Sequence, residues 1–142
     1  GRRMIIRNPA STVDLIVEDE EGITLVKRKN EPFKGYWALP GGFLEYGKEN
    51  LKQAGVRELR EETGLCAREE DLILTGEYSD QNRDPRGHVI AHPFWVRKYG
   101  GNLQAGDDAC EVKKFPRNSL PDLAFDHAKI LQDYFEFRIN YR

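Results

Sequence analysis

"VRELREETGL", residues 56–65, places five charged side chains in the six positions from Arg57 to Glu62 and closes on Gly64 and Leu65. Residues 49–63 contain no proline, and Gly64 stands where a left-handed residue ends many helices. The stretch therefore predicts a helix over residues 49–63. Whether its glutamates form a solvated face or a site decides how the rest of the chain is interpreted.

A helical wheel places the glutamates beside the apolar side of this predicted helix. The apolar stripe consists of Leu51, Ala54, Gly55 and Leu59. At about 100° per residue, Glu58 and Glu62 lie within about 20° of Leu51. Glu61 lies about 80° away on the same side, and only Arg60 points directly away. A solvated face is therefore the weaker interpretation, and the i, i+3 and i+4 spacing predicts converging carboxylates.

Converging carboxylates at a half-buried edge need positive charge nearby, because repulsion and lost solvation otherwise favour their protonation. Arg57 flanks the cluster and neutralises one charge; the remainder suits a hard divalent cation such as Mg²⁺ or Mn²⁺. "LPGGF", residues 39–43, adds Gly41 and Gly42 just before the helix. Paired glycines are often only a turn. Beside an acid cluster and a helix N-terminus, they predict a site for metal-bound phosphate.

Length and composition favour a single globular domain, residues 1–142. Hydrophobic residues make up 39% of the chain and charged residues 32%, which suits a soluble domain with a core. The net charge of −2 argues against binding to nucleic acid or to an anionic membrane surface. Two cysteines give neither a disulfide framework nor a zinc pattern. We therefore expect a reduced, cytoplasmic setting.

The remaining sequence alternates strands and loops around the predicted helix. Strands are predicted over residues 11–19, 22–29, 71–79, 88–99 and 110–116. A long structured loop is predicted over residues 30–47 and an amphipathic closing helix over residues 124–137. Strands before and after a central helix favour a mixed sheet with helices packed on its faces.

The helix and the loop before it resemble the Nudix hydrolases. The signature of that family reads Gly, five residues, Glu, seven residues, then Arg-Glu-(aliphatic)-x-Glu-Glu-x-Gly-(aliphatic). "RELREETGL" matches every fixed position from Arg57 to Leu65, and seven residues separate Glu49 from Arg57. One departure is visible, since six residues separate Gly42 from Glu49. We place the extra residue in the loop, so that the acid cluster is undisturbed; whether Glu49 still orients Arg57 is then a question for the structure.

The resemblance implies an α+β fold, an α/β/α sandwich with a mixed β-sheet between helices. It also implies Mg²⁺-dependent hydrolysis of a nucleoside diphosphate linked to another group, with Mn²⁺ as the alternative metal. The residues that it assigns to the metal are Gly42, Glu58, Glu61 and Glu62. Those that it assigns to catalysis are Arg57, Glu61 and, as a distal acid that activates water, Glu111. A plain surface acid is the alternative for Glu111. Family members are often homodimers, so a homodimer is expected.

Two further stretches are similar to the ADP-ribose pyrophosphatases of this family: "DQNRDPRGHVI", residues 80–90, and "LAFDHAKIL", residues 123–131. We expect Arg83 and Arg86 to clamp phosphate. The alternative is a solvated turn in which Asp84 pairs with Arg86. Asp126 and His127 are expected to position the substrate, with N-capping of the last helix by Asp126 as the alternative.

Aromatic residues before the glycine pair are candidates for holding a base. Phe33 and Trp37 are expected to sandwich an adenine, because every base offers a π-face. Core packing is the alternative for both. His88 is expected to start a strand rather than to bind a ligand.

The residues together favour hydrolysis of ADP-ribose to AMP and ribose 5-phosphate. Two alternatives stay open: a pyrophosphohydrolase that removes oxidised nucleoside triphosphates, and a non-catalytic domain that senses ADP-ribose. Sensors of that kind carry a DNA-binding extension after the domain, and the complete acid set favours an enzyme. The expected partner is a small-molecule nucleotide, with no nucleic acid and no membrane.

Overall fold

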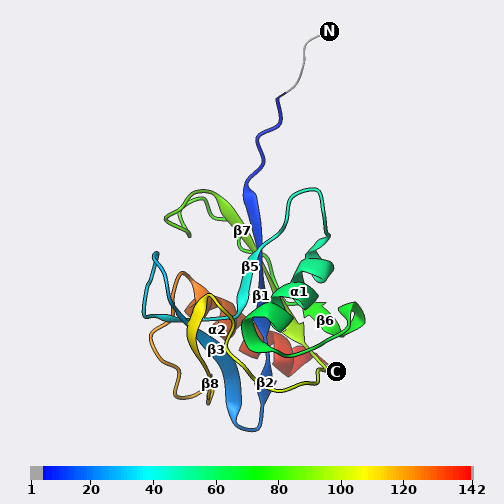
Figure 1. The fold of residues 1–142 in the computed structure, drawn as a ribbon, viewed down its shortest axis with the longest axis vertical. Coiled ribbons are helices and arrows are strands. Elements are labelled where there is room, and N and C mark those ends of the chain that lie inside the picture. Colours follow the sequence, from blue (N-terminus) through cyan, green and yellow to red (C-terminus); the bar gives the residue numbers. More distant parts are fainter. Residues whose placement is uncertain (1–4, 142) are drawn as a thin grey trace.

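The computed structural model describes residues 5–141, so the predicted domain of residues 1–142 is described except at its two ends. Its elements are two four-stranded sheets, the helices α1 (Leu51–Thr63) and α2 (His127–Asn140), and a short 3₁₀ helix, η1 (Glu69–Asp71) (Figure 1). Within residues 5–141, no helix is long and apolar enough to cross a membrane.

Parallel and antiparallel pairings are both present. The first sheet has the order β5–β1–β7–β6, from Gly41–Phe43, Ala10–Ile16, Val89–Val96 and Leu72–Leu74. β1 and β7 run parallel, and the other two pairings are antiparallel. In the second sheet β3 (Gly22–Arg28) pairs antiparallel with β2 (Glu18–Asp19), β4 (Trp37–Ala38) and β8 (Ala109–Phe115). The prediction of a mixed sheet is confirmed, with the strands divided between two sheets.

Two apolar cores lie on opposite faces of β1. The first joins β1 to α1 and contains Val13, Leu15, Val17, Ala54 and Leu59. The second joins the other face of β1 to β3 and α2 and contains Ile16, Ile23, Leu25, Ile130, Leu131 and Tyr134. α1 and α2 thus lie on opposite sides of β1 (Figure 1), as an α/β/α sandwich requires. By the period of two in a strand, Thr12 and Asp14 share the α2 face with Ile16.

The central helix begins and ends on the residues that its caps select. Asn50 accepts a hydrogen bond from the Gln53 amide, and the Gln53 side chain accepts one from the Asn50 amide, which completes a capping box. Gly64 closes the helix with φ 77°, and its N–H donates to the Arg60 carbonyl. The predicted end is therefore correct, while the start moves from residue 49 to Leu51 because Asn50 is the cap.

Several other boundaries differ from the prediction. The predicted strand over residues 11–19 divides into β1 and β2, and the one over residues 88–99 begins at Val89, after His88, and ends at Val96. The predicted loop over residues 30–47 contains the short strands β4 and β5. The predicted strand over residues 71–79 keeps only Leu72–Leu74, and Tyr78 makes an isolated bridge to Ala91. The closing helix begins at His127 instead of residue 124, because Phe125 has φ 52°, which no helix accommodates.

Candidate active site

A cavity of about 470 Å³ opens where the start of α2, the glycine-rich strand β5 and helix α1 come together. Its walls include Asp14 of β1, Arg28 at the end of β3, Gly42 of β5 and Glu58 and Glu62 of α1. The 80–90 loop supplies Arg83, Asp84 and Arg86, and Phe125 and His127 come from the start of α2. Its volume lies within the range of ordinary small-molecule sites.

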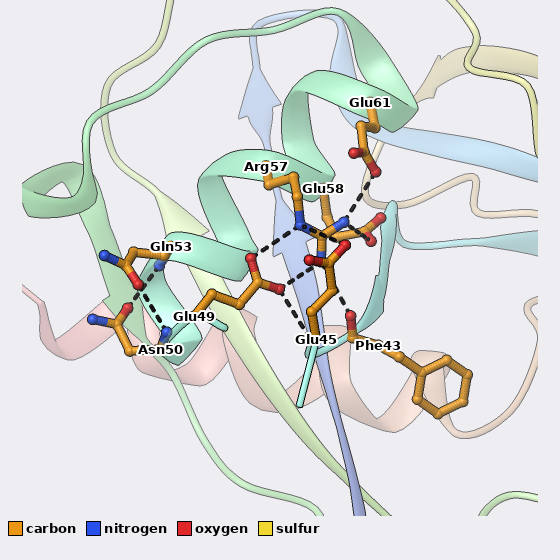
Figure 2. Close-up of polar contacts among 8 residues, drawn as sticks. All are labelled: Phe43, Glu45, Glu49, Asn50, Gln53, Arg57, Glu58 and Glu61. Atoms are coloured by element: carbon orange, nitrogen blue, oxygen red, sulfur yellow. Dashed lines mark hydrogen bonds and ion pairs between the residues drawn. The ribbon is translucent and has the colours of Figure 1, made fainter. Parts of the chain in front are cut away.

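Arg57 organises the acids along one side of α1 (Figure 2). Its guanidinium donates two hydrogen bonds to Glu49, at 2.7 and 3.0 Å, one to Glu58 at 2.7 Å and one to Glu61 at 3.0 Å. It also donates to the carbonyl of Phe43 at 3.1 Å, which ties the helix to β5. The extra residue between Gly42 and Glu49 therefore leaves the Glu49–Arg57 contact intact.

Glu58 and Glu62 are the acids of α1 that face the cavity. Glu58 is only 8% exposed and packs against Gly42, since a Cβ at Gly42 would lie 2.5 Å from Glu58 Oε1. Burial raises the pKa of Glu58, and Arg57 partly offsets that rise. Burial also raises the pKa of Glu62, to about 7, and the charges of Glu58, Asp108 and Glu61 add to the rise. A bound cation would stabilise this pair in its charged form.

Glu61 departs from the prediction. Its side chain is 58% exposed and pairs with Arg57, and it does not line the cavity. The wheel explains this result, because at about 80° from Leu51 it lies just beyond Ala54, at about 60°. Of the three predicted carboxylates, Glu58 and Glu62 line the cavity, whereas Glu61 shares the Nη1 atom of Arg57 with Glu58 outside it. The assignment of Glu61 to the metal stays a prediction.

The donor set around this pair fits a hard cation that keeps other ligands. Within residues 5–141, no group of three His, Cys, Asp or Glu side chains encloses a site on its own. Mg²⁺ is commonly bound through one or two carboxylates, with water and substrate phosphate completing the octahedron. Glu58 and Glu62, with the Gly42 backbone beside them, match that pattern.

Arg83 and Arg86 have different surroundings. Arg83 is buried, with 6% of its side chain exposed, and its fork donates to both oxygens of Asp126 and to the Val89 carbonyl. Arg86 is 37% exposed, pairs with Asp84 at 2.8 Å and lies over the Phe43 ring at 4.7 Å. Arg86 therefore has a face toward the cavity, whereas Arg83 fixes the 80–90 loop to the start of α2.

Asp126 and His127 are both engaged by the fold. Asp126 occupies the N-cap position but makes no capping hydrogen bond, because Arg83 holds its carboxylate. The N-capping alternative is therefore wrong. His127 Nδ1 accepts the Leu39 N–H at 3.0 Å, which places the ring proton on Nε2. Burial lowers the pKa of His127 to about 4, so the ring is neutral near pH 7.

Asp14 lies beside His127 in the wall of the cavity. Its Oδ1 is 3.6 Å from His127 Nε2, and its Oδ2 is buried without a hydrogen-bond partner among the described residues. Burial raises the pKa of Asp14 to about 7, against the opposing charge of Arg83. An unsatisfied buried carboxyl oxygen is uncommon in folded proteins.

The aromatic side chains divide between the cavity and the core. The Trp37 ring packs on Phe115 at 4.8 Å, within the second core, so its core alternative is the one observed. Phe33 contacts Phe125 at 4.9 Å, and Phe125 lines the cavity. Phe33 and Phe125 have φ of 61° and 52°, which is unusual for bulky residues and common at functional sites.

A family model described as the NUDIX domain matches residues 8–134. The chain belongs to the Nudix hydrolase family. The fold expected from the Nudix resemblance is thereby confirmed, and so is the enzyme class, a pyrophosphohydrolase.

Three similar proteins carry informative names. An ADP-ribose pyrophosphatase of Methanocaldococcus jannaschii is 53% identical over 131 residues, which cover 92% of this chain and 76% of that protein. The ADPR responsive transcriptional repressor NtrR of Acinetobacter baylyi is 31% identical over 90% of this chain and 54% of the repressor. A Francisella tularensis bifunctional NMN adenylyltransferase/ADP ribose pyrophosphatase, solved with AMP and a Mn ion, superposes with a TM-score of 0.78 at 33% identity. That match covers 92% of this Nudix chain and 42% of the bifunctional protein, so the chain spans about half or less of the last two.

Glu111, the expected distal acid of this Nudix site, lies outside the cavity. Glu111 lies on β8 in register with Lys27, is exposed and does not line the cavity. Asp108 does line it, and its charge contributes to the raised pKa of Glu62. Both acids are visible in "GDDACEVKKF", residues 106–115, but only the path of the loop decides which one turns inward.

Arg28, Phe125 and Asp14 are cavity residues that sequence reasoning missed. Arg28 ends a strand of alternating character, and its guanidinium lies over the Phe125 ring at 5.0 Å. Phe125 belongs to "LAFDH", yet an aromatic in an amphipathic segment predicts core packing. The only sequence signal for Asp14 was an acid inside an otherwise apolar strand, "STVDLIV", residues 11–17.

Proposed function

We propose that this Nudix hydrolase cleaves ADP-ribose to AMP and ribose 5-phosphate with Mg²⁺ as its cofactor. One observation carries the proposal: a single cavity joins the acid pair of buried Glu58 and half-buried Glu62 to two arginines, Arg28 and Arg86, that lie over an aromatic ring. The acid pair can hold a metal ion and the arginines can neutralise phosphate. This combination suits a nucleoside diphosphate. The names of the similar proteins support ADP-ribose in particular.

Glu58 and Glu62, with the backbone of Gly42, would hold the metal ion. Mg²⁺ would screen phosphate charge and make a water molecule more acidic; Mn²⁺ is the alternative, and the Francisella structure contains it. Arg57 fixes the Glu58 carboxylate by a 2.7 Å hydrogen bond, and Glu61 acts through Arg57. These residues position the acid pair before substrate arrives.

The remaining residues handle the phosphates and the proton. Arg86 and Arg28 neutralise the diphosphate, which raises the electrophilicity of phosphorus and holds the leaving phosphate. We assign the general base to Asp108, whose carboxylate takes the proton of the attacking water. The new bond forms between water oxygen and phosphorus, the bridging P–O bond breaks, and the electron pair leaves with the second phosphate.

A substrate panel tests the proposal. It contains ADP-ribose, sugar nucleotides, dinucleoside polyphosphates and oxidised and ordinary nucleoside triphosphates, each with and without Mg²⁺. We expect ADP-ribose to give AMP with the highest kcat/KM, and turnover to vanish with a chelator. Rapid triphosphate turnover without ADP-ribose turnover would overturn the substrate assignment.

Substitution of Glu62 tests the acid pair in the same assay. Glu62→Gln should lower kcat by about 100-fold or more, because one ligand of the cation loses its charge, while the fold is retained. Glu61→Gln should cost less, since Glu61 acts through Arg57. Glu69→Gln, an exposed acid outside the cavity, is the control. A Glu62→Gln rate close to that of the unsubstituted protein would contradict the metal assignment.

A sensor role is the second candidate, favoured by the likeness to the NtrR repressor. A sensor would bind ADP-ribose tightly in calorimetry and fail to turn it over in the panel. The retained pair Glu58–Glu62 and the nearby Asp108 favour the enzyme. The homodimer stays a prediction, which light scattering on the purified chain tests.

A further inference from the structure

Two polar groups in one wall of the cavity have no partner that satisfies them. Asp14 is 5% exposed and His127 is also 5% exposed, yet both line the cavity. Asp14 Oδ2 has no hydrogen-bond partner within residues 5–141. The His127 Nε2–H lies 3.6 Å from Asp14 Oδ1, which is too long for a good hydrogen bond. A buried polar group left in this state costs free energy, so a partner is expected in some state of the protein.

The two groups have opposite hydrogen-bonding characters. The Leu39 N–H occupies His127 Nδ1, so Nε2 carries the proton and can only donate. Asp14 offers a carboxyl oxygen that can accept whatever its protonation state, because one oxygen of a carboxyl always keeps acceptor lone pairs. The wall therefore presents one donor and one acceptor side by side.

The neighbours of this pair select the part of the ligand that reaches it. The Phe125 ring lies 5.4 Å from the His127 ring, and the same Phe125 ring carries Arg28 at 5.0 Å and Arg86 at 5.2 Å. A phosphate is drawn to the arginines and repelled by the carboxyl of Asp14. Arg28 and Arg86 already cover the Phe125 ring, and a planar base stacks on a guanidinium as well as on an aromatic ring. A base held on one of these guanidiniums would bring a neutral edge, and not a phosphate, to Asp14 and His127.

We propose that Asp14 and His127 read the amino edge of adenine, and so make the site select adenine nucleotides over 6-oxopurine nucleotides. Asp14 accepts a hydrogen bond from the exocyclic amine of adenine, and His127 Nε2 donates to the adjacent ring nitrogen N1. A 6-oxopurine reverses both characters, with an oxygen acceptor at position 6 and an N–H donor at N1. This inference rests on the proposed function, which it deepens by naming the base and the residues that choose it.

The turnover test compares ADP-ribose with its hypoxanthine analogue, IDP-ribose. The unsubstituted protein should prefer ADP-ribose by about 10-fold or more in kcat/KM, the size expected of one or two base-edge hydrogen bonds. Asp14→Asn keeps the shape but offers an amide N–H, so the preference should fall by at least about 10-fold and move toward IDP-ribose. Asp14→Leu removes the acceptor without adding a donor and leaves the His127 donor in place, so the preference should shrink without reversing.

A binding test separates this inference from the proposed function. AMP and IMP are titrated by calorimetry into the metal-free protein and into Asp14→Asn, which needs no turnover. The unsubstituted protein should bind AMP more tightly than IMP, and Asp14→Asn should lose that preference. If ADP-ribose is not hydrolysed but these preferences hold, the proposed function fails and the base assignment stands. Equal changes for AMP and IMP would overturn the base assignment, whatever the turnover results.

Two controls test whether the effect of Asp14→Asn is specific to the cavity and to the base. Asp71→Asn changes a buried acid outside the cavity and should leave the AMP to IMP ratio unchanged. ADP-glucose replaces the sugar of the second phosphate; if Asp14→Asn alters only the ADP-ribose to ADP-glucose ratio, Asp14 contacts the sugar and the base assignment is wrong. Asp14→Asn exchanges an unpaired buried carboxyl for a neutral amide, so thermal unfolding should show a folded protein with an unchanged or higher Tm.

Discussion

Arg83 and Arg86 stand three positions apart, and their contacts give them separate roles. Arg83 uses its whole fork inside the protein, on Asp126 and on the Val89 carbonyl. Arg86 pairs with Asp84 along one edge and leaves its face over the rings of Phe43 and Phe125. The sequence alone makes these arginines equivalent candidates for phosphate.

Replacing each arginine by lysine separates the two roles. Arg83→Lys keeps the charge but not the two-pronged bond, so the free energy of unfolding should fall by about 1–2 kcal/mol. Arg86→Lys keeps an ion pair with Asp84 and should change stability by under about 0.5 kcal/mol. Its KM for ADP-ribose should instead rise by about 10-fold, since the planar cation over the ring is lost. Urea unfolding and steady-state kinetics measure both effects. Equal stability losses in the two variants would contradict this division.

The individual site residues were predictable to the extent that one helix determines them. Arg57, Glu58 and Glu62 follow from spacing on α1, and the structure brings them together. That Glu61 lies outside the cavity could not be predicted, because a helical wheel gives angles and does not show where the buried side of the helix ends. Asp14 was not predictable, because its partner His127 lies 113 positions away in the sequence (127 − 14) and only the fold brings the two residues together.

At the level of elements, β5 and α1 meet through two glycines with different neighbours. A Cβ at Gly42 would lie 2.5 Å from Glu58 Oε1, the movable end of a side chain. A Cβ at Gly41 would lie 2.0 Å from the Val13 carbonyl oxygen, which is backbone of the neighbouring strand. Gly42 therefore makes room for the Glu58 carboxylate, and Gly41 allows β5 to pair closely with β1.

Alanine substitutions should show that difference. Gly42→Ala displaces the Glu58 carboxylate, so kcat/KM should fall by about 10- to 100-fold, with under about 1 kcal/mol lost in stability. Gly41→Ala pushes two strands apart and should cost more than about 2 kcal/mol in urea unfolding. A Gly42→Ala protein with full activity would show that the Glu58 carboxylate can move without consequence.

The elements themselves were predictable where local signals are strong. Asn50, Gln53 and Gly64 define both ends of α1 by side-chain and backbone capping. β4 and β5 contain two and three residues, too few for an alternating pattern to register, and they exist because β3 and β1 offer an edge to pair with. The later start of α2 at His127 was not predictable, because it follows from the positive φ of Phe125 and the sequence does not show that angle.

For the whole molecule, the mixed arrangement of strands was predictable and its division into two sheets was not. The parallel pairing of β1 with β7 joins residues nearly eighty positions apart, and the antiparallel pairing of β3 with β8 joins residues at a similar distance in the sequence. Such pairings leave no mark in a local pattern, and the cavity is lined by residues of both sheets. The position of Asp108 in the cavity, rather than Glu111, follows from the same long-range pairing of β8.

Glu18 ties the second sheet to α2 and to the segment after β8. Its carboxylate accepts two hydrogen bonds from Arg117, at 2.6 and 2.9 Å, and one from the hydroxyl of Tyr134 at 2.8 Å. Burial alone would raise the pKa of Glu18, but the hydrogen bonds from Arg117 and Tyr134 outweigh it and hold the pKa below its ordinary value of 4.5. The unfolded chain therefore binds a proton at this site at a higher pH than the folded protein does, and stability rises with pH across that interval.

Replacing Glu18 by glutamine should reveal this contribution as a function of pH. Above about pH 5.5 the unsubstituted protein should be more stable than Glu18→Gln by about 1–2 kcal/mol, since Arg117 is half-exposed and its pair is partly screened. As the pH falls below 4.5 and then through the lowered pKa of folded Glu18, the difference should shrink toward zero. Urea unfolding of both proteins between pH 7 and pH 3.5 measures it, and the difference between them cancels the titration of the other acids.

Glu21→Gln, an exposed acid in the neighbouring turn, should stay within about 0.5 kcal/mol of the unsubstituted protein at every pH. A constant difference between the unsubstituted protein and Glu18→Gln down to pH 3.5 would show that the Glu18 carboxylate joins the second sheet to α2 by its shape and not by its charge.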